Sequence, residues 1–203
     1  MILALDTSGG ELVACLLDDD LHMLRGLAEP GRKHQDRVVE VVQELLGAGR
    51  GEALDSVAVA RGPGSQTGLR VGLATAEGLA FARRLPIVPV SSLAVAAHRL
   101  AIEGTGIAAV SAGRSNVYAQ AFQAAGAGRR MLSVRVRCAL DEVHARLGLA
   151  EETPLATEPA LSRAGAGVEA IRSGAEALAA ATREAVGRGR QVAYDRLAGD
   201  YGE

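Results

Sequence analysis

Residues 60–68, ARGPGSQTG, combine glycines, a proline and hydroxyl side chains, a mixture found in loops that bind phosphate. A Walker A loop requires Gly-Lys-Ser/Thr at its end, but here Gly68 is followed by Leu69 and Arg70. The dinucleotide pattern G-x-G-x-x-G also fails, because Gly68 comes one residue too late after Gly64. Free N–H groups at a helix start can still bind an anion, but the interpretation we favour is a tight turn and a helix cap.

The remaining reactive side chains form no catalytic pattern. Four serines are candidate nucleophiles: Ser65, Ser91, Ser92 and Ser111. None lies in a G-x-S-x-G elbow, and serines near helix starts are usually caps. The histidines are His22, His34, His98 and His144, and none pairs with another at a metal-ligand spacing. We therefore expect no catalytic residue and no metal ligand.

The composition narrows the class of protein. The chain has 203 residues, a formal net charge of -2, 48% hydrophobic and 2% aromatic residues. This balance argues against a protein that binds nucleic acid alone, because such binding draws on basic and aromatic side chains. We find no signal peptide and no apolar run of 18 residues, and Cys15 and Cys138 lie far apart, so we expect a reduced cytoplasmic protein without membrane contact.

The hydrophobic periodicity predicts a mixed α/β chain. Strands are predicted at 2–8, 11–19, 21–29, 55–60, 86–90, 106–112, 116–123 and 130–138. Helices are predicted at 33–49, 67–82, 91–102, 139–149 and 167–190. A boundary near 103–106 divides the chain into domains 1–104 and 105–203.

Two of these helices carry the residues that we predict at a protein interface. In the first helix they are His34, Val38, Val41, Val42 and Leu45, of which the last four share one face. In the second they are Gly68, Leu69, Gly72, Leu73, Ala76 and Ala80. The glycines and alanines of the second set form a stripe at intervals of four. A glycine inside a helix costs roughly 1 kcal/mol relative to alanine, and close approach of another element offsets that cost. The periodicity leaves open whether that element belongs to the same chain or to a partner.

Four segments in order resemble one family: ILALDTS, RKHQD, ARGPGSQTGLRVGLATAEGLA and LPIVPVSSLAVAA. Over about residues 1–100 the chain is similar to the TsaB (YeaZ) family of bacterial tRNA threonylcarbamoyladenosine biosynthesis proteins, relatives of the glycoprotease-like, M22-type TsaD. The resemblance implies a duplicated α/β fold of the actin, sugar kinase and Hsp70 (ribonuclease H-like) type. It also implies a partner-binding first domain, 1–104, and a smaller, divergent second domain, 105–203.

The resemblance implies a non-catalytic partner of TsaD. Together with the ATPase TsaE, these proteins install threonylcarbamoyl on the adenosine next to the anticodon in tRNAs that read codons starting with A. The pair associates through the first domains, and a similar surface supports a homodimer. ATP and metal are expected on the partner subunits, and tRNA is contacted only through the complex.

Particular residues fit or depart from this pattern. Where catalytic relatives carry His-x-x-x-His, this chain has Ser92 and Ala96, which favours a non-catalytic role. Asp6 and Thr7 occupy the place where actin-like folds bind nucleotide phosphates. A weak ATP or ADP site is one interpretation there, and a strand-end turn is the commoner one. Ser111 replaces the usual Asp of the second domain, although Arg114 and Tyr118 are kept.

Our leading hypothesis is therefore a scaffold subunit that binds and stabilises TsaD. An alternative is an enzyme in its own right, either a peptidase or a nucleotide hydrolase. The missing histidine pair argues against a metallopeptidase. A third hypothesis is a stand-alone homodimeric binding protein.

Overall fold

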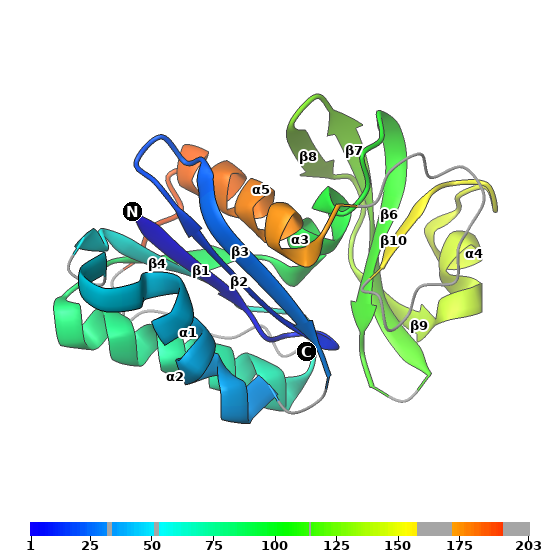
Figure 1. Cartoon of the computed structure of the whole chain (residues 1–203). Helices are drawn as coiled ribbons and strands as arrows, with labels where there is room; N and C mark the ends of the chain where they lie inside the picture. The colour runs from blue at the N-terminus through cyan, green and yellow to red at the C-terminus, as the bar shows by residue number, and fades with distance from the viewer. Residues whose placement is uncertain (32–33, 51–52, 114, 158–171, 193–203) are drawn as a thin grey trace.

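The computed structural model describes residues 1–31, 34–50, 53–113, 115–157 and 172–192, with residues 34, 35 and 48–50 described by their backbone alone. Two β-sheets lie side by side, and helices cover their faces (Figure 1). Among the described residues, no helix is long and apolar enough to cross a membrane.

The first sheet has five strands in the order β3-β2-β1-β4-β5. Their bounds are β1 Ile2–Asp6, β2 Glu11–Leu17, β3 Met23–Pro30, β4 Ser56–Ala60 and β5 Ile87–Val90. The first three strands are antiparallel, whereas β4 runs parallel to β1 and β5 parallel to β4. Leu3 and Leu5 belong to the apolar core on one face, and Ile2 and Ala4 to the core on the other. Because both faces are covered, the strand reads as a continuous apolar run.

Helices from distant parts of the sequence cover this sheet. The α-helices of the described residues are α1 His34–Arg50, α2 Gln66–Arg83, α3 Ser92–His98, α4 Val143–Leu147 and α5 Gly174–Gly187, and of these α4 lies on the second sheet. The helices α1 and α2 lie on one face, and α5 crosses the other (Figure 1). A Cβ on Gly26 of β3 would lie 2.6 Å from the Cβ of Ala175, so this glycine allows α5 to lie close to the strand. The predicted range 105–203 thus contributes a helix to the first sheet.

The second sheet follows the order β10-β6-β7-β8, and β9 also pairs with β7. Its strands are β6 Gly104–Ser111, β7 Asn116–Ala125, β8 Gly128–Met131, β9 Val136–Ala139 and β10 Leu155–Thr157. One face packs on α3 through Leu93, Ala97 and Leu100. The other packs on α4 through Val143. The helix α3 also contacts α5, so it links the two sheets.

The two sheets repeat one topology. The order β8-β7-β6-β10 matches β3-β2-β1-β4, with three antiparallel strands and then one strand parallel to the first. Within the described ranges, the second sheet has no counterpart of β5, and α4 spans 5 residues. The predicted class, a duplicated actin-like, ribonuclease H-like α/β fold with a shortened second half, is therefore confirmed.

The sequence predictions fail mainly in the second half of the chain. The strand predicted at 130–138 is two strands, because β7 has two residues between Ala119 and Phe122 while the opposite segment has four between Met131 and Val136. Because of these two extra residues, the hydrogen bonds between this segment and β7 are interrupted, and two separate strands form. The helix predicted at 139–149 is a 3-10 turn followed by the short α4. The helix predicted at 167–190 begins at Gly174, and residues 167–171 lie outside the description. The strand β10 was not predicted.

Candidate functional site

The glycine-rich stretch leads from the end of β4 into α2 and contacts the residues that follow β1. The Ser65 N–H donates to the Ser8 carbonyl oxygen at 2.8 Å, and the Ser65 hydroxyl caps α2 by accepting from the Gly68 N–H. The Thr7 hydroxyl donates to the Gly68 carbonyl oxygen at 2.6 Å. The N–H groups of Ser65 and Gly68 are therefore used by the protein itself. Our preferred interpretation, a turn and a helix cap, is confirmed.

Gly68 and Gly72 allow α2 to lie almost against β1. A Cβ added to Gly68 would be 1.9 Å from the Thr7 carbonyl oxygen, and one added to Gly72 would be 2.4 Å from the Thr7 hydroxyl oxygen. Ala76 and Ala80 follow on the same buried face. The neighbour that the small-residue stripe requires is therefore part of the same chain.

This placement corrects the face that we assigned to the interface. The predicted residues of α2, namely Gly68, Leu69, Gly72, Leu73, Ala76 and Ala80, are all buried. On α1, Val38, Val41, Val42 and Leu45 are buried in the same apolar core. Their periodicity marked the sides of the helices that pack on the sheet, because core packing and partner binding give the same apolar pattern. His34 is the first residue of α1, and its side chain lies outside the description.

The outer faces of these helices present a different set of residues. Val39 on α1 and Phe81 on α2 are 57% and 67% exposed. On α2, Ala74 and Gly78 are exposed one turn apart. A Cβ added to Gly78 would meet nothing within 4 Å, so internal packing does not explain this glycine. An interface on α1 and α2 stays a prediction, and exposed residues such as these four are accessible to it.

A small cavity lies between the two sheets, beside the end of β1. Its volume is about 20 Å³. That is room for about one water molecule. Its lining residues are Asp6, Ser8, Gly9, Glu11, Val13, Ser92, Val95, Ala96, Arg99 and Val110. The structure thus brings together Asp6 with Ser92 and Ala96, three positions that the sequence analysis singled out separately.

The Asp6 carboxylate accepts hydrogen bonds from the turn that follows β1. One carboxylate oxygen accepts hydrogen bonds from the Ser8 N–H at 2.8 Å and the Ser8 hydroxyl at 2.6 Å. Burial raises the pKa of Asp6, although the Ser8 hydrogen bonds oppose that shift. Thr7 faces α2 rather than the cavity. Nucleotide binding at Asp6 and Thr7 stays a prediction.

Polar pairs near this cavity join α3 and the residue after it to the first sheet and to α5. Arg99, which follows α3, donates to Glu11 of β2, and both side chains are largely buried. His98 is fully buried, and its Nε2 lies 2.8 Å from a carboxylate oxygen of Glu184 on α5. Burial lowers the pKa of His98, while Glu184 opposes the shift. His98 therefore has a structural contact, which the sequence could not show because its partner lies 86 residues away.

Other candidate groups are scattered. Cys15 and Cys138 are buried free thiols, and burial raises the pKa of Cys15 to about 12. Among the described residues, no group of three or more His, Cys, Asp or Glu side chains is placed to hold a metal ion. Tyr118 is buried beneath the guanidinium groups of Arg135 and Arg137, at 5.5 and 5.9 Å from its ring centroid. Arg114 lies outside the description.

The chain is similar to known proteins over most of its length. A family model described as TsaD: tRNA N6-adenosine threonylcarbamoyltransferase matches residues 28–198. The tRNA threonylcarbamoyladenosine biosynthesis protein TsaB of Haemophilus influenzae is 40% identical over 123 residues, which are 58% of this chain and 51% of that protein. The TsaB of Bacillus subtilis is 34% identical over 125 residues, 60% of this chain and 55% of that protein. The chain thus spans about half the length of these curated relatives.

A solved structure supports the same relationship. YeaZ from Pseudomonas aeruginosa superimposes with a TM-score of 0.72 at 25% identity, and the match covers 98% of both chains. Other relatives, among them one from Geobacter sp., bear the name tRNA N6-adenosine threonylcarbamoyltransferase. From the family match, the TsaB relatives and the superposition together, the chain belongs to the TsaB (YeaZ) group of the TsaD family.

Proposed function

We propose that this chain is a non-catalytic subunit in the biosynthesis of threonylcarbamoyladenosine in tRNA. It binds and stabilises a TsaD-type transferase, which acts together with a TsaE-type ATPase on the adenosine next to the anticodon. ATP and metal belong to the partners, tRNA is met through the assembly, and the complex works in the cytoplasm. The names of the TsaB relatives support the pathway.

The observation that carries the non-catalytic role is the lining of the small cavity. Ser92 is the first residue of α3, and Ala96 lies one turn further along. By the family resemblance, these are the places where catalytic relatives carry two histidines. A methyl group and a hydroxyl at these places supply no pair of nitrogen ligands. Both side chains are buried, and Ala96 lies in the core under the second sheet. These positions therefore contribute packing.

The outer faces of α1 and α2 are the surface that we propose for the partner. Phe81 and Val39 expose apolar side chains on these helices, and such side chains are available for contact with a partner. Ala74 and Gly78 leave the outer side of α2 smooth, so another helix can lie close. The same surface serves a homodimer when TsaD is absent.

Reconstitution tests the function. The purified chain, TsaD and TsaE from one organism are combined with tRNA and the threonylcarbamoyl donor, and the modified nucleoside is measured by mass spectrometry. We expect product only when this chain is present. Equal product without it, or robust ATP or peptide hydrolysis by the chain alone, would refute the scaffold role and favour the enzyme hypothesis.

A matched pair of variants tests the surface. Ala74→Arg adds bulk and charge on the outer face of α2, whereas Ala145→Arg makes the same change at an exposed position of α4. We expect Ala74→Arg to weaken co-purification with TsaD at least tenfold and to reduce any homodimer seen by light scattering. Ala145→Arg should leave both unchanged. Equal binding by the two variants would place the interface elsewhere.

A further inference from the structure

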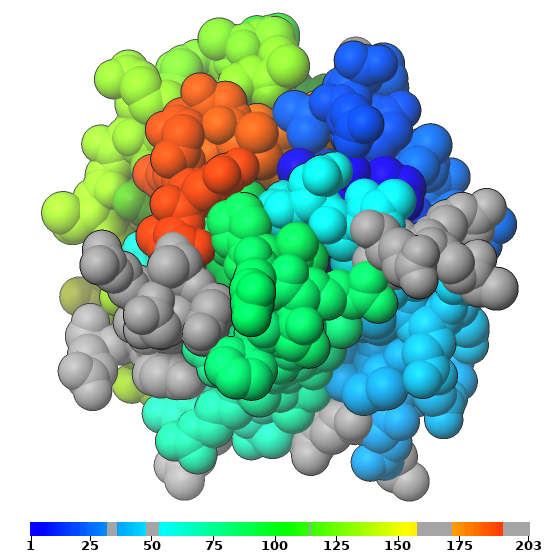
Figure 2. Space-filling view, turned by 90° about the vertical axis from the view of Figure 1, so that its left-hand side faces the viewer, coloured from blue at the N-terminus to red at the C-terminus, as the bar shows by residue number. Residues whose placement is uncertain are grey.

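A second, larger pocket lies beside α5, outside the region discussed so far. Its volume is about 550 Å³. This size is typical of sites for small molecules. Its walls are Met23, Ala127, Gly128, Arg172, Glu176, Ala179, Ala180, Arg183 and Glu184. They come from β3, from the β7–β8 turn and from α5, and Figure 2 shows α5 (orange to red) between the blue and lime-green parts of the surface that hold those two segments. The pocket is therefore shared by both sheets.

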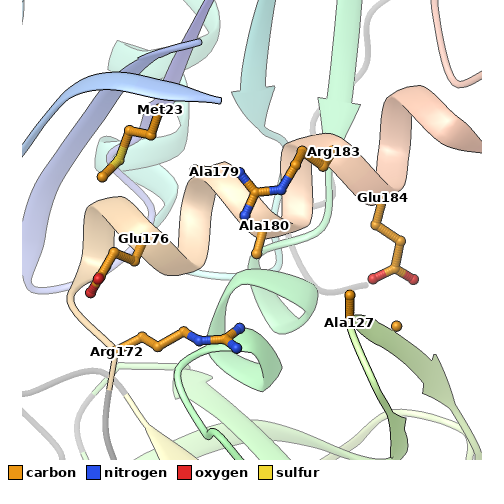
Figure 3. Close-up of a pocket in the computed structure, with 9 residues that line it drawn as sticks. Met23, Ala127, Arg172, Glu176, Ala179, Ala180, Arg183 and Glu184 are labelled. Atoms are coloured by element: carbon orange, nitrogen blue, oxygen red, sulfur yellow. The ribbon is translucent and has the colours of Figure 1, made fainter. Parts of the chain in front are cut away.

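Two arginines enter this pocket from different places in the chain. Arg172 extends from the segment before α5, and Arg183 from α5 itself, with the small side chains of Ala179 and Ala180 between them (Figure 3). One Arg183 nitrogen donates to the Leu21 carbonyl oxygen at 3.1 Å. Since a guanidinium has five N–H donors, the others remain available. Across the described part of the chain, the Arg172 guanidinium has neither a hydrogen-bond partner nor an ion-pair partner.

The carboxylates of the pocket are already bound to other groups. Glu176 accepts hydrogen bonds from the Ser173 N–H and hydroxyl, both at 2.8 Å, which lower the pKa of Glu176. Glu184 contacts His98 and forms an ion pair with Arg188. The acidic groups thus have fixed partners, whereas the arginines keep free donors.

One wall of the pocket is held in place by a further arginine. Arg129 is buried, and it donates to the carbonyl oxygens of Gly126 and Gly128 in the β7–β8 turn and of Leu100 after α3. Burial and then the nearby charge of Arg172 lower the pKa of Arg129, while Glu103 and Glu184 oppose that shift. The site is therefore built on a turn and a helix, and its lining holds two arginines and two glutamates.

We propose that this pocket binds a small molecule bearing a phosphate or carboxylate group. The guanidinium groups of Arg172 and Arg183 hold its oxygens, because a planar guanidinium pairs with two oxygens of such an anion. The methyl groups of Ala179 and Ala180 receive its apolar part. A ligand bound in this way lies between α5 and the β7–β8 turn, because Ala127 and Gly128 of that turn line the same pocket. This binding is independent of the TsaD surface, which lies on the opposite face of the first sheet.

The test uses the full chain with three probes: inorganic phosphate, pyrophosphate and citrate, each compared with chloride at equal ionic strength. Binding is measured by calorimetry and by the rise in melting temperature. We expect Arg172→Gln to weaken binding of the preferred probe at least tenfold, and Arg172→Lys to restore part of it. Arg130→Gln is the matched control, because Arg130 is an exposed arginine on β8 that does not line the pocket.

The preferred probe decides the class of ligand. A stronger response to phosphate or pyrophosphate identifies a phosphate compound, and a stronger response to citrate identifies a carboxylate. The proposal is overturned if no probe exceeds chloride, or if Arg172→Gln and Arg130→Gln bind equally. Circular dichroism confirms that each variant is folded. Because the Arg172 side chain has no hydrogen-bond or ion-pair partner among the described residues, we expect its replacement to leave the fold intact.

Discussion

The two faces of the first sheet are covered by helices in different ways. On one face, Gly68 of α2 lies against the backbone of Thr7, the residue after β1, and Gly72 lies against the Thr7 side chain. On the other face, α5 is tied by a buried polar pair, His98 with Glu184. Both contacts depend on small side chains, since Gly26 also lets α5 lie close to β3. The α5 side depends in addition on the protonation of His98, so we expect the two faces to differ in their response to pH.

The largest expected effect comes from adding one methyl group on the α2 side. In Gly68→Ala the Cβ would lie 1.9 Å from the Thr7 carbonyl oxygen, which is backbone and cannot rotate away. We expect a loss of about 4 kcal/mol in the free energy of unfolding, above the usual range for overpacking. Urea unfolding followed by circular dichroism measures it. A loss below about 1 kcal/mol would show that α2 moves away from β1 at little cost.

Gly72→Ala should have a smaller effect, because here the obstacle is a side chain. The new Cβ would lie 2.4 Å from the Thr7 hydroxyl oxygen but 3.6 Å from the Thr7 Cβ. We expect a loss of about 2 kcal/mol. Thr7→Ala removes the obstacle together with one hydrogen bond to Gly68, at about 1 kcal/mol.

The double variant sharpens this prediction. If the clash is with the hydroxyl, Gly72→Ala in the Thr7→Ala background should cost less than in the wild type, with a coupling of about 1 kcal/mol. Additive losses would mean that the glycine is required for another reason, such as the nearby Val59 side chain.

On the α5 side, acid should weaken the fold. Burial lowers the pKa of His98 below its ordinary 6.5, so the unfolded chain takes up this proton first as the pH falls. The free energy of unfolding should therefore decrease below about pH 6.5, with a slope of at most about 1.4 kcal/mol per pH unit. In His98→Gln that slope should be reduced. His22→Gln is the control, because the His22 side chain is 80% exposed.

Comparison with the control isolates the α5 contact from other titrating groups. Asp6 has a raised pKa, and its stabilising contribution changes in the opposite direction, increasing as the pH falls. It is present in the wild type and in both variants, so it cancels in the difference. Equal slopes for His98→Gln and His22→Gln would show that the His98 contact does not govern the acid response.

The sequence predicted the first half of the fold well, since its elements have strong periodicity and carry their own stop signals. Ser65 and the glycines before it, Gly62 and Gly64, correctly predicted a turn and a cap. The sequence could not show whether the small-residue face of α2 packs on β1 or on a partner, because Gly72 would allow close approach of either. The His98 contact was also hidden, because it joins residues 86 positions apart.

The second half was harder to predict for physical reasons. Its strand at 130–138 breaks where unequal numbers of residues oppose each other, and no pattern within the segment itself reveals that mismatch. The strand β10 has three residues and depends entirely on pairing with β6. The larger pocket could not be foreseen either, since Met23, Ala127 and Arg172 meet only after both sheets and α5 have assembled.

The smallest expected effect lies on the outer face of α2, which touches neither sheet. A Cβ at Gly78 would meet nothing within 4 Å, so Gly78→Ala should stabilise the chain by about 0.5–1 kcal/mol through helix propensity alone. The same urea measurement that detects the loss in Gly68→Ala would detect this gain with the opposite sign. Destabilisation would show that Gly78 has an internal role. A gain in stability together with weaker TsaD binding would mean that the glycine is kept for close approach of a partner, as the inner glycines are kept for β1.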